Sequence, residues 1–121
     1  MSHQNKIKLK RVYDEPAKTD GVRLLADRLW PRGVKKTELD HDDWIKTLCP
    51  PNELRKAWHQ HDMSYDEFKK RYRQSLKAES QALTRLADTA KKQQITLLSA
   101  VKDLEQSHLP ILKQAIVEAM K

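Results

Sequence analysis

The apolar run at residues 94–101, which contains Ile-Thr-Leu-Leu-Ser-Ala at positions 95–100, limits the fold more than any other stretch of this sequence. It lacks the alternation of polar and apolar side chains that a half-exposed strand shows. A strand that is apolar almost throughout is covered on both faces, which is typical of the centre of a parallel sheet. We therefore expect a central strand here, and we expect it to end at Lys102-Asp103.

Two further strands are predicted near the N-terminus. Residues 6–13 alternate in character and predict a first strand, whereas residues 1–5 are polar and predict a frayed tail. Residues 14–21 are rich in Asp, Pro and Gly, which favours a turn. Residues 22–27 alternate again and predict a second strand, which must stop before Pro31 because proline has no backbone N–H to donate.

Helical patterns fill the segment between the second and the last strand. Asp40 or Asp42 is expected to cap a short helix that carries Trp44, and Asn52 is expected to cap a second one. Ser64-Tyr65-Asp66-Glu67 fits a capping box and starts a longer helix, and another helical run covers residues 79–92. A final helix follows Ser107, with Pro110 tolerated in its first turn.

This order of elements predicts an α/β fold in one small domain over residues 1–121, with a mainly parallel sheet of few strands and several flanking helices. The second and last strands are then parallel and joined by a long right-handed helical crossover. Parallel strands place ligands at their carboxyl ends. Asp27-Arg28 and Lys102-Asp103 would therefore meet at one edge of the sheet and form a single site.

The stretch at residues 26–33, Ala-Asp-Arg-Leu-Trp-Pro-Arg-Gly, gathers the side chains most suited to bind a ligand. Pro31 and Gly33 make it a stiff loop, so Arg28 and Arg32 can converge on one anion. The structural alternative is equally supported by the spacing. In it, Asp27 pairs with one of these arginines, and Trp30 is a core side chain whose N–H bonds to a carbonyl.

Composition narrows the classes of partner. Lys and Arg number 24 against 17 acidic residues, so an anionic partner, including a nucleic acid, is electrostatically plausible. Cys49 is the single cysteine, which excludes an intramolecular disulfide, and His41 and the His59-Gln60-His61 pair are too weak a pattern to predict a metal. No cofactor is expected. No run approaches the roughly 20 apolar residues that cross a bilayer, so we expect a cytoplasmic protein without membrane contact.

The residues that carry a resemblance to a known family are the Asp27–Gly33 run, Trp44, Glu53-Leu54-Arg55, His61-Asp62, Phe68, Arg71-Tyr72 and the last strand through Lys102-Asp103. Through them, the chain resembles domain-of-unknown-function family 488 in its short, YeaO-like form. The resemblance covers nearly the whole chain. It implies a small bacterial α/β protein and matches the family pattern at Asp27, Arg28, Trp30, Pro31, Arg32, Gly33, Lys102 and Asp103. It supplies no mechanism. Gln60 stands where relatives commonly have glycine, and Ser99 stands where they have an aromatic residue, which would reshape the pocket.

Two functions are compatible with these residues. In the first, Arg28 and Arg32 bind a small phosphate- or carboxylate-bearing ligand. Catalysis would then use Asp27 or Asp103 as general base, and Lys102 or His61 as acid or electrostatic stabiliser. In the second, Trp30 stacks on a nucleobase beside a basic surface, as in a nucleic-acid-binding module.

Overall fold

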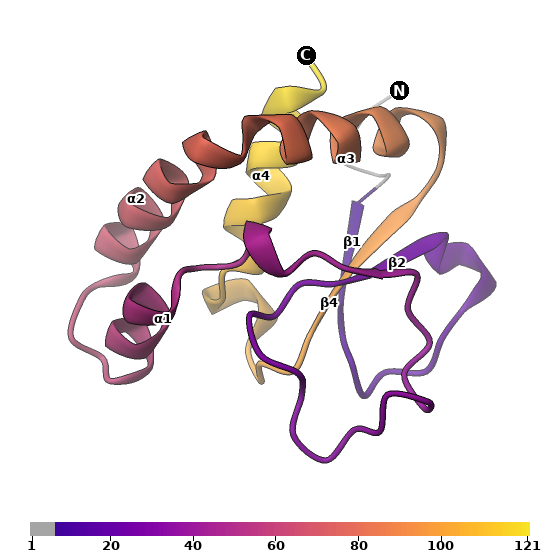
Figure 1. Ribbon diagram of the computed structural model, residues 1–121, viewed down its shortest axis with the longest axis horizontal. Helices are drawn as coiled ribbons and strands as arrows, with labels where there is room; N and C mark the ends of the chain where they lie inside the picture. The colour runs from indigo at the N-terminus through magenta and orange to yellow at the C-terminus, as the bar shows by residue number, and fades with distance from the viewer. Residues whose placement is uncertain (1–6) are drawn as a thin grey trace.

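The computed structural model describes residues 7–121 and has an α/β fold, as predicted; the predicted tail at residues 1–5 lies outside the described residues. Its sheet has the strand order β1-β4-β2-β3, and every neighbouring pair is parallel (Figure 1). The strands and α-helices are, in chain order, β1 (Ile7–Arg11), β2 (Val22–Leu25), β3 (Asp43–Trp44), α1 (Asn52–His59), α2 (Tyr65–Leu76), α3 (Ser80–Lys92), β4 (Ile95–Ser99) and α4 (Leu109–Ala119).

Strand β4 lies at the centre of the sheet, as its apolar composition predicts. Leu97 is in register with Leu9 of β1 on one side and with Leu24 of β2 on the other. All five residues of β4 are buried. The central position follows from the sequence because a strand without a polar face cannot lie at a solvated edge.

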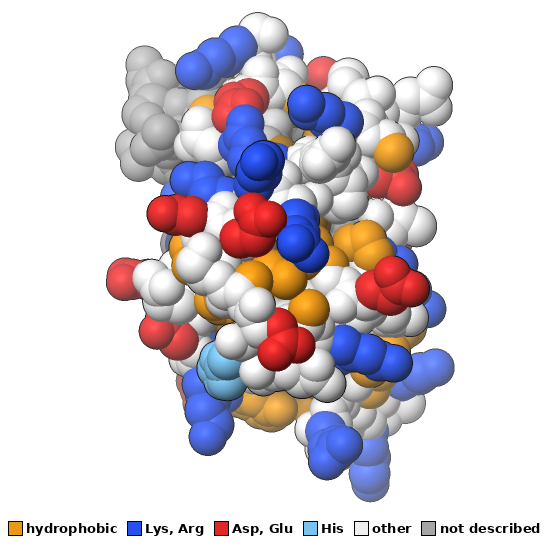
Figure 2. Space-filling model, turned by 90° about the vertical axis from the view of Figure 1, so that its left-hand side faces the viewer, with side chains coloured by type: hydrophobic (Ala, Val, Ile, Leu, Met, Phe, Trp, Pro, Cys, Tyr) orange, Lys and Arg blue, Asp and Glu red, His pale blue; other side chains and the backbone are white. Residues whose placement is uncertain are grey.

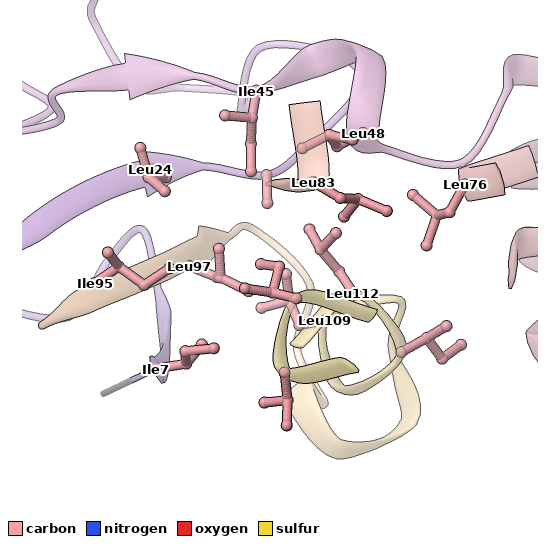
Figure 3. Close-up of a cluster of buried hydrophobic side chains, with 14 of the residues drawn as sticks. Ile7, Leu24, Ile45, Leu48, Leu76, Leu83, Ile95, Leu97, Leu109 and Leu112 are labelled. Carbon is pink, nitrogen blue, oxygen red and sulfur yellow. The ribbon is translucent and has the colours of Figure 1, made fainter. Parts of the chain in front are cut away.

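The two faces of the sheet are covered differently. On one face, Leu97 and Leu24 pack with helical side chains such as Leu83 of α3 and Leu112 of α4 in the main core (Figure 3). On the other face, Leu25 and its neighbours are covered by the loops that follow β1 and β2. This second, smaller cluster consists of Val12, Leu25, Leu39 and Leu98, with Trp30, Val34, Trp44 and Ala100 packed against it.

A buried ion cluster holds the loop-covered face at the start of β2. Asp20 is fully buried and accepts hydrogen bonds from Ala17 N at 3.0 Å, from Lys10 Nζ at 3.0 Å and from the Arg23 guanidinium. Lys8 Nζ lies 3.3 Å from the same carboxylate. Burial alone would raise the pKa of Asp20, but these donors outweigh it and hold the pKa well below its ordinary value. Lys8 and Lys10 of β1 and Arg23 of β2 therefore share one buried carboxylate within the fold.

The helices that follow residue 64 form as predicted. Ser64 Oγ accepts Glu67 N at 3.1 Å at the start of α2, while the Glu67 carboxylate accepts Arg71 Nε at 3.2 Å. A 3-10 turn at Lys77–Glu79 separates α2 from α3. Among the described residues, no helix combines the length and apolar character needed to cross a membrane.

The helix predicted after Asp40 or Asp42 is wrong. Trp44 lies instead in the short edge strand β3, in register with Leu25, and only a 3-10 turn, Lys46–Leu48, follows it. The Asp42 carboxylate accepts Arg23 N at 2.7 Å rather than capping a helix. The reason is tertiary, because the open edge of β2 presents backbone groups that need partners and this segment supplies them.

Candidate functional site

A cavity of about 610 Å³ lies at the carboxyl edge of the sheet, where the chain leaves β2 and β4. Its volume is within the range of small-molecule sites. The structure brings both predicted charged pairs, Asp27-Arg28 and Lys102-Asp103, to this cavity, although 75 positions separate Asp27 from Lys102. Every site residue proposed from the sequence lines it, namely Asp27, Arg28, Trp30, Arg32, His61, Lys102 and Asp103.

Asp27 is held by the end of the central strand. Its carboxylate accepts Ser99 Oγ at 2.6 Å and Ala100 N at 2.8 Å, and His108 Nε2 lies 3.7 Å from Oδ1. Among the described residues, neither Arg28 nor Arg32 forms an ion pair with it, although the sequence had made such a pair an alternative. The Ser99 hydroxyl thus orients this carboxylate.

Arg28 and Trp30 both bond to backbone carbonyls. Arg28 donates from Nε to Pro50 O at 3.1 Å and from Nη2 to Cys49 O at 2.7 Å, which ties the loop after β2 to the start of α1. Trp30 donates from Nε1 to Val34 O at 2.6 Å, and its ring meets those of His41 and Trp44 edge-on. For Trp30, this geometry is that of the core side chain considered from the sequence.

Arg32 and Lys102 are exposed at the cavity, and neither forms an ion pair with a described residue. Asp103 is also exposed, and its carboxylate accepts Glu105 N at 3.1 Å and Gln106 N at 3.3 Å. It therefore caps the short 3-10 turn Leu104–Gln106 as well as bordering the cavity.

His61 lies just beyond α1 in the left-handed backbone region, with φ 59°. Its N–H bonds to Trp58 O at 3.0 Å, and Asp62 N bonds to Ala57 O at 3.1 Å, which together form a Schellman motif. Glycine is the usual residue at this position because it lacks a Cβ. A histidine here directs an imidazole to the cavity at a conformational cost.

Helix α1 adds a cavity wall that sequence reasoning missed. Arg55, Trp58 and His59 line the cavity from this helix. Within residues 7–121, Arg55 Nε is the buried side-chain nitrogen for which no hydrogen-bond partner is found. The spacing of Arg55 and Trp58, three residues apart, places both on one helix face. That signal was present in the sequence, but no site residue was proposed on this helix.

His108 was also missed. It is buried at the floor of the cavity, and its Nε2–H donates to Ala26 O. Burial lowers the pKa of His108, because it disfavours the charged ring, while the Ala26 carbonyl and the Asp27 charge act in the opposite direction. His108 follows Ser107, whose hydroxyl accepts Leu109 N at 3.1 Å at the start of α4. In the sequence, this place just before a helix was the local sign that His108 could belong to the site.

Two other kinds of chemistry, a cysteine nucleophile and a bound metal ion, can be compared with the structure. Cys49 is buried, and burial raises the pKa of its thiol, so it is a core side chain rather than a nucleophile. Over residues 7–121, no group of three or more His, Cys, Asp and Glu side chains is arranged to hold a metal ion.

Two relatives match this chain over most of its length. The chain is 48% identical over 106 residues to the uncharacterized protein YeaO of Escherichia coli (strain K12), an alignment that covers 88% of this chain and 92% of that protein. It is 32% identical over 116 residues to an uncharacterized protein of Mycobacterium tuberculosis, covering 96% of this chain and 98% of that protein. No solved structure matches.

The model of one protein family matches nearly all of the chain. It is DUF488-N3i, described as the inactive DUF488-N3 subclade, and it matches residues 6–121. Together with the identity to YeaO, this match confirms the resemblance inferred from the Asp27–Gly33 run. The chain therefore belongs to domain-of-unknown-function family 488, within its inactive DUF488-N3 subclade.

Proposed function

We propose that this protein binds a small phosphate- or carboxylate-bearing ligand in the cavity at the carboxyl edge of the sheet. The observation that carries the proposal is Arg55, which lines the cavity while its buried Nε has no acceptor among the described residues. A buried donor without a partner costs about 1–3 kcal/mol. An anion that gives this guanidinium an acceptor after a small side-chain rotation removes that cost.

The charges around the cavity favour an anion. Four permanent cations line it, Arg28, Arg32, Arg55 and Lys102, against the carboxylates of Asp27 and Asp103. Both carboxylates already accept hydrogen bonds from backbone N–H groups. Because Gly21 and Gly33 are the only glycines in the chain, a backbone phosphate loop is not expected, and side chains must hold the ligand.

Arg32 is the predicted ligand contact with the greatest freedom to move. Arg28 already has two carbonyl acceptors, whereas Arg32 is exposed and without an ion-pair partner in the described part of the chain. We assign Arg32, Arg55 and Lys102 to the anion itself, and Arg28 to positioning the loop that carries Arg32.

Binding is better supported than catalysis. Asp27, the predicted general base, has its carboxylate held by Ser99 and Ala100, which suits it to accept a ligand's hydrogen bond in a fixed position. The description of the family as an inactive subclade agrees with a binding role. Asp103, Lys102 and His61 then bind or orient the ligand rather than transfer protons.

The nucleic-acid alternative has less support. It needs Trp30 free to stack beside a basic surface, but Trp30 is half-buried, donates Nε1 to Val34 O and packs against the rings of His41 and Trp44. Lys8 and Lys10 are paired with Asp20. On the face that Figure 2 shows, basic and acidic side chains are interleaved rather than separated. A strong field of one sign, which nucleic-acid binding uses, is not seen on this face.

Thermal unfolding with added anions tests the proposal. Inorganic phosphate and citrate are titrated against the wild type, Arg32→Ala, Arg55→Met and the control Arg85→Ala, which removes one exposed cation of α3 outside the cavity. A ligand at 100 times its Kd stabilises the folded state by about 2.7 kcal/mol. We expect this gain in the wild type and in Arg85→Ala, and a much smaller gain in the two cavity variants.

Each unfavourable result has a separate meaning. Equal anion responses in Arg55→Met and Arg85→Ala would show only general charge effects and would overturn the proposed site. If neither phosphate nor citrate stabilises the wild type, the proposed anion site is also overturned. Binding of labelled single-stranded DNA that weakens with salt and with Trp30→Ala would favour the nucleic-acid alternative instead.

A further inference from the structure

An aromatic stack forms part of the cavity wall beside Arg55. The Trp58 and Phe68 rings lie nearly parallel, with their centroids 4.8 Å apart and an angle of 16° between them. Phe68 is 1% exposed, whereas Trp58 is only partly buried, and both line the cavity. Tyr65 tilts against the same indole at 5.6 Å. The indole is therefore fixed from one side by rings beneath it and borders open space.

A fixed indole at a cavity wall is suited to stack on a planar ring. Stacking on an aromatic side chain accepts any nucleobase because every base has a π face. Since Trp58 and Arg55 are neighbours on one face of α1, a ring on the indole places an attached anion near the guanidinium. The cavity, at about 610 Å³, has room for both parts.

We infer that the ligand class is the nucleoside monophosphates, with the base against Trp58 and the phosphate held by Arg55, Arg32 and Lys102. This inference rests on the proposed anion site and adds the ring to it. Arg55 links the stacking surface to the anion site, because it lies on α1 beside Trp58 and is one of the cations that line the cavity.

Asp27 suits the donors of such a ligand. Its two oxygens accept one protein donor each, from Ser99 and from Ala100, and a carboxylate oxygen can accept two. The side chain is 14% exposed and lines the cavity. A nucleoside monophosphate supplies hydroxyl and amino donors that fit them, whereas inorganic phosphate supplies few.

The experiment compares ligands that share the anion and differ in the ring. Binding of ribose 5-phosphate, adenosine 5′-monophosphate and cytidine 5′-monophosphate is measured by calorimetry to the wild type, Trp58→Leu and Trp58→Phe. Stacking predicts that the nucleotides bind roughly 5- to 150-fold more tightly than ribose 5-phosphate to the wild type. Trp58→Leu should lower the nucleotide affinity to that of ribose 5-phosphate, and Trp58→Phe should restore most of the difference.

Tryptophan fluorescence gives an independent readout. Nucleotide binding should quench the emission of the wild type, and Trp58→Phe should remove the part of the quench that comes from Trp58, while Trp30, which also lines the cavity, and Trp44 remain. If Trp58→Leu does not fold, the comparison of ligands and the Trp58→Phe fluorescence still decide the question.

The outcomes separate the two proposals. Equal affinity of the wild type for ribose 5-phosphate and for both nucleotides would leave an anion site and overturn the nucleotide inference. A nucleotide preference that persists in Trp58→Leu would overturn the role of the stack. If no phosphate compound binds, this inference fails, and if citrate does not bind either, the proposed function fails as well.

Discussion

Ser99 donates a hydrogen bond of 2.6 Å from its hydroxyl to Asp27 Oδ1, across 72 positions of the sequence. This bond joins the ends of β4 and β2 at the edge where the cavity lies. Ala100 N adds a second donor to Oδ2 at 2.8 Å. The orientation of the Asp27 carboxylate therefore depends on the central strand rather than on the arginines beside it in sequence.

Ser99→Ala should lower the free energy of unfolding by about 1.5–3 kcal/mol, because it removes a buried donor to a charged group. Urea unfolding measures the change. Thr84→Ala serves as control, since the Thr84 hydroxyl bonds only to Ser80 O on the exposed side of α3. A loss for Ser99→Ala no larger than that for Thr84→Ala would show that the bond to Asp27 contributes little.

Asp20→Asn should destabilise the protein by about 3–5 kcal/mol, since it leaves Arg23 and Lys10 buried without their counter-charge. The control Asp88→Asn removes an exposed carboxylate on α3 and should change stability by less than about 0.5 kcal/mol. A similar small effect for both variants would contradict a stabilising role for this cluster.

The same carboxylate predicts a pH dependence. The folded state holds the Asp20 pKa below its ordinary value of 3.8, so the stability it supplies is present above that pH and is lost as the pH falls below it. The difference in unfolding free energy between the wild type and Asp20→Asn should be constant from about pH 7 to pH 5 and should narrow below about pH 4. If the difference in unfolding free energy instead widened below about pH 4, the result would contradict a lowered pKa of Asp20 in the folded state.

His61→Gly should stabilise the unliganded protein by roughly 0.5–1 kcal/mol, because glycine adopts the positive φ of 59° without a Cβ penalty. The matched change two residues earlier, His59→Gly, falls on the last residue of α1, where the backbone is helical, and should destabilise by up to a similar amount. Both histidines line the cavity, so thermal melts are compared without added anions. Destabilisation by both changes would contradict the conformational argument.

Gly21 and Gly33 should respond very differently to alanine. Both have positive φ, but an added Cβ at Gly21 would lie 2.0 Å from Gln94 O, whereas nothing lies within 4 Å at Gly33. Gly33→Ala should cost about 1 kcal/mol from backbone strain alone. Gly21→Ala must also displace the backbone before β4, so we expect severe loss of folded protein by circular dichroism. Comparable melting temperatures would show that the turn before β2 relaxes easily.

The sequence by itself determined the strands β1, β2 and β4, the later helices and the edge of the sheet at which the polar side chains gather. The apolar run of β4 has no polar face, and Ser64 places a cap one residue before α2. Both features are local. The first depends on the order of polar and apolar side chains along the strand, and the second depends on backbone groups within a few residues of Ser64. The α/β fold and the meeting of Asp27 with Lys102 follow once parallel strands are assumed.

Only the tertiary structure decided which of these side chains remain available to a ligand. Arg28 and Trp30 bond to carbonyls, whereas Arg55 and Trp58, on a helix for which no site residue was proposed, form a cavity wall. Trp44 became a strand residue because the edge of β2 required backbone partners. Hydrogen bonding between segments far apart in sequence has no local period, so the position of each donor and acceptor is settled only when the chain is packed.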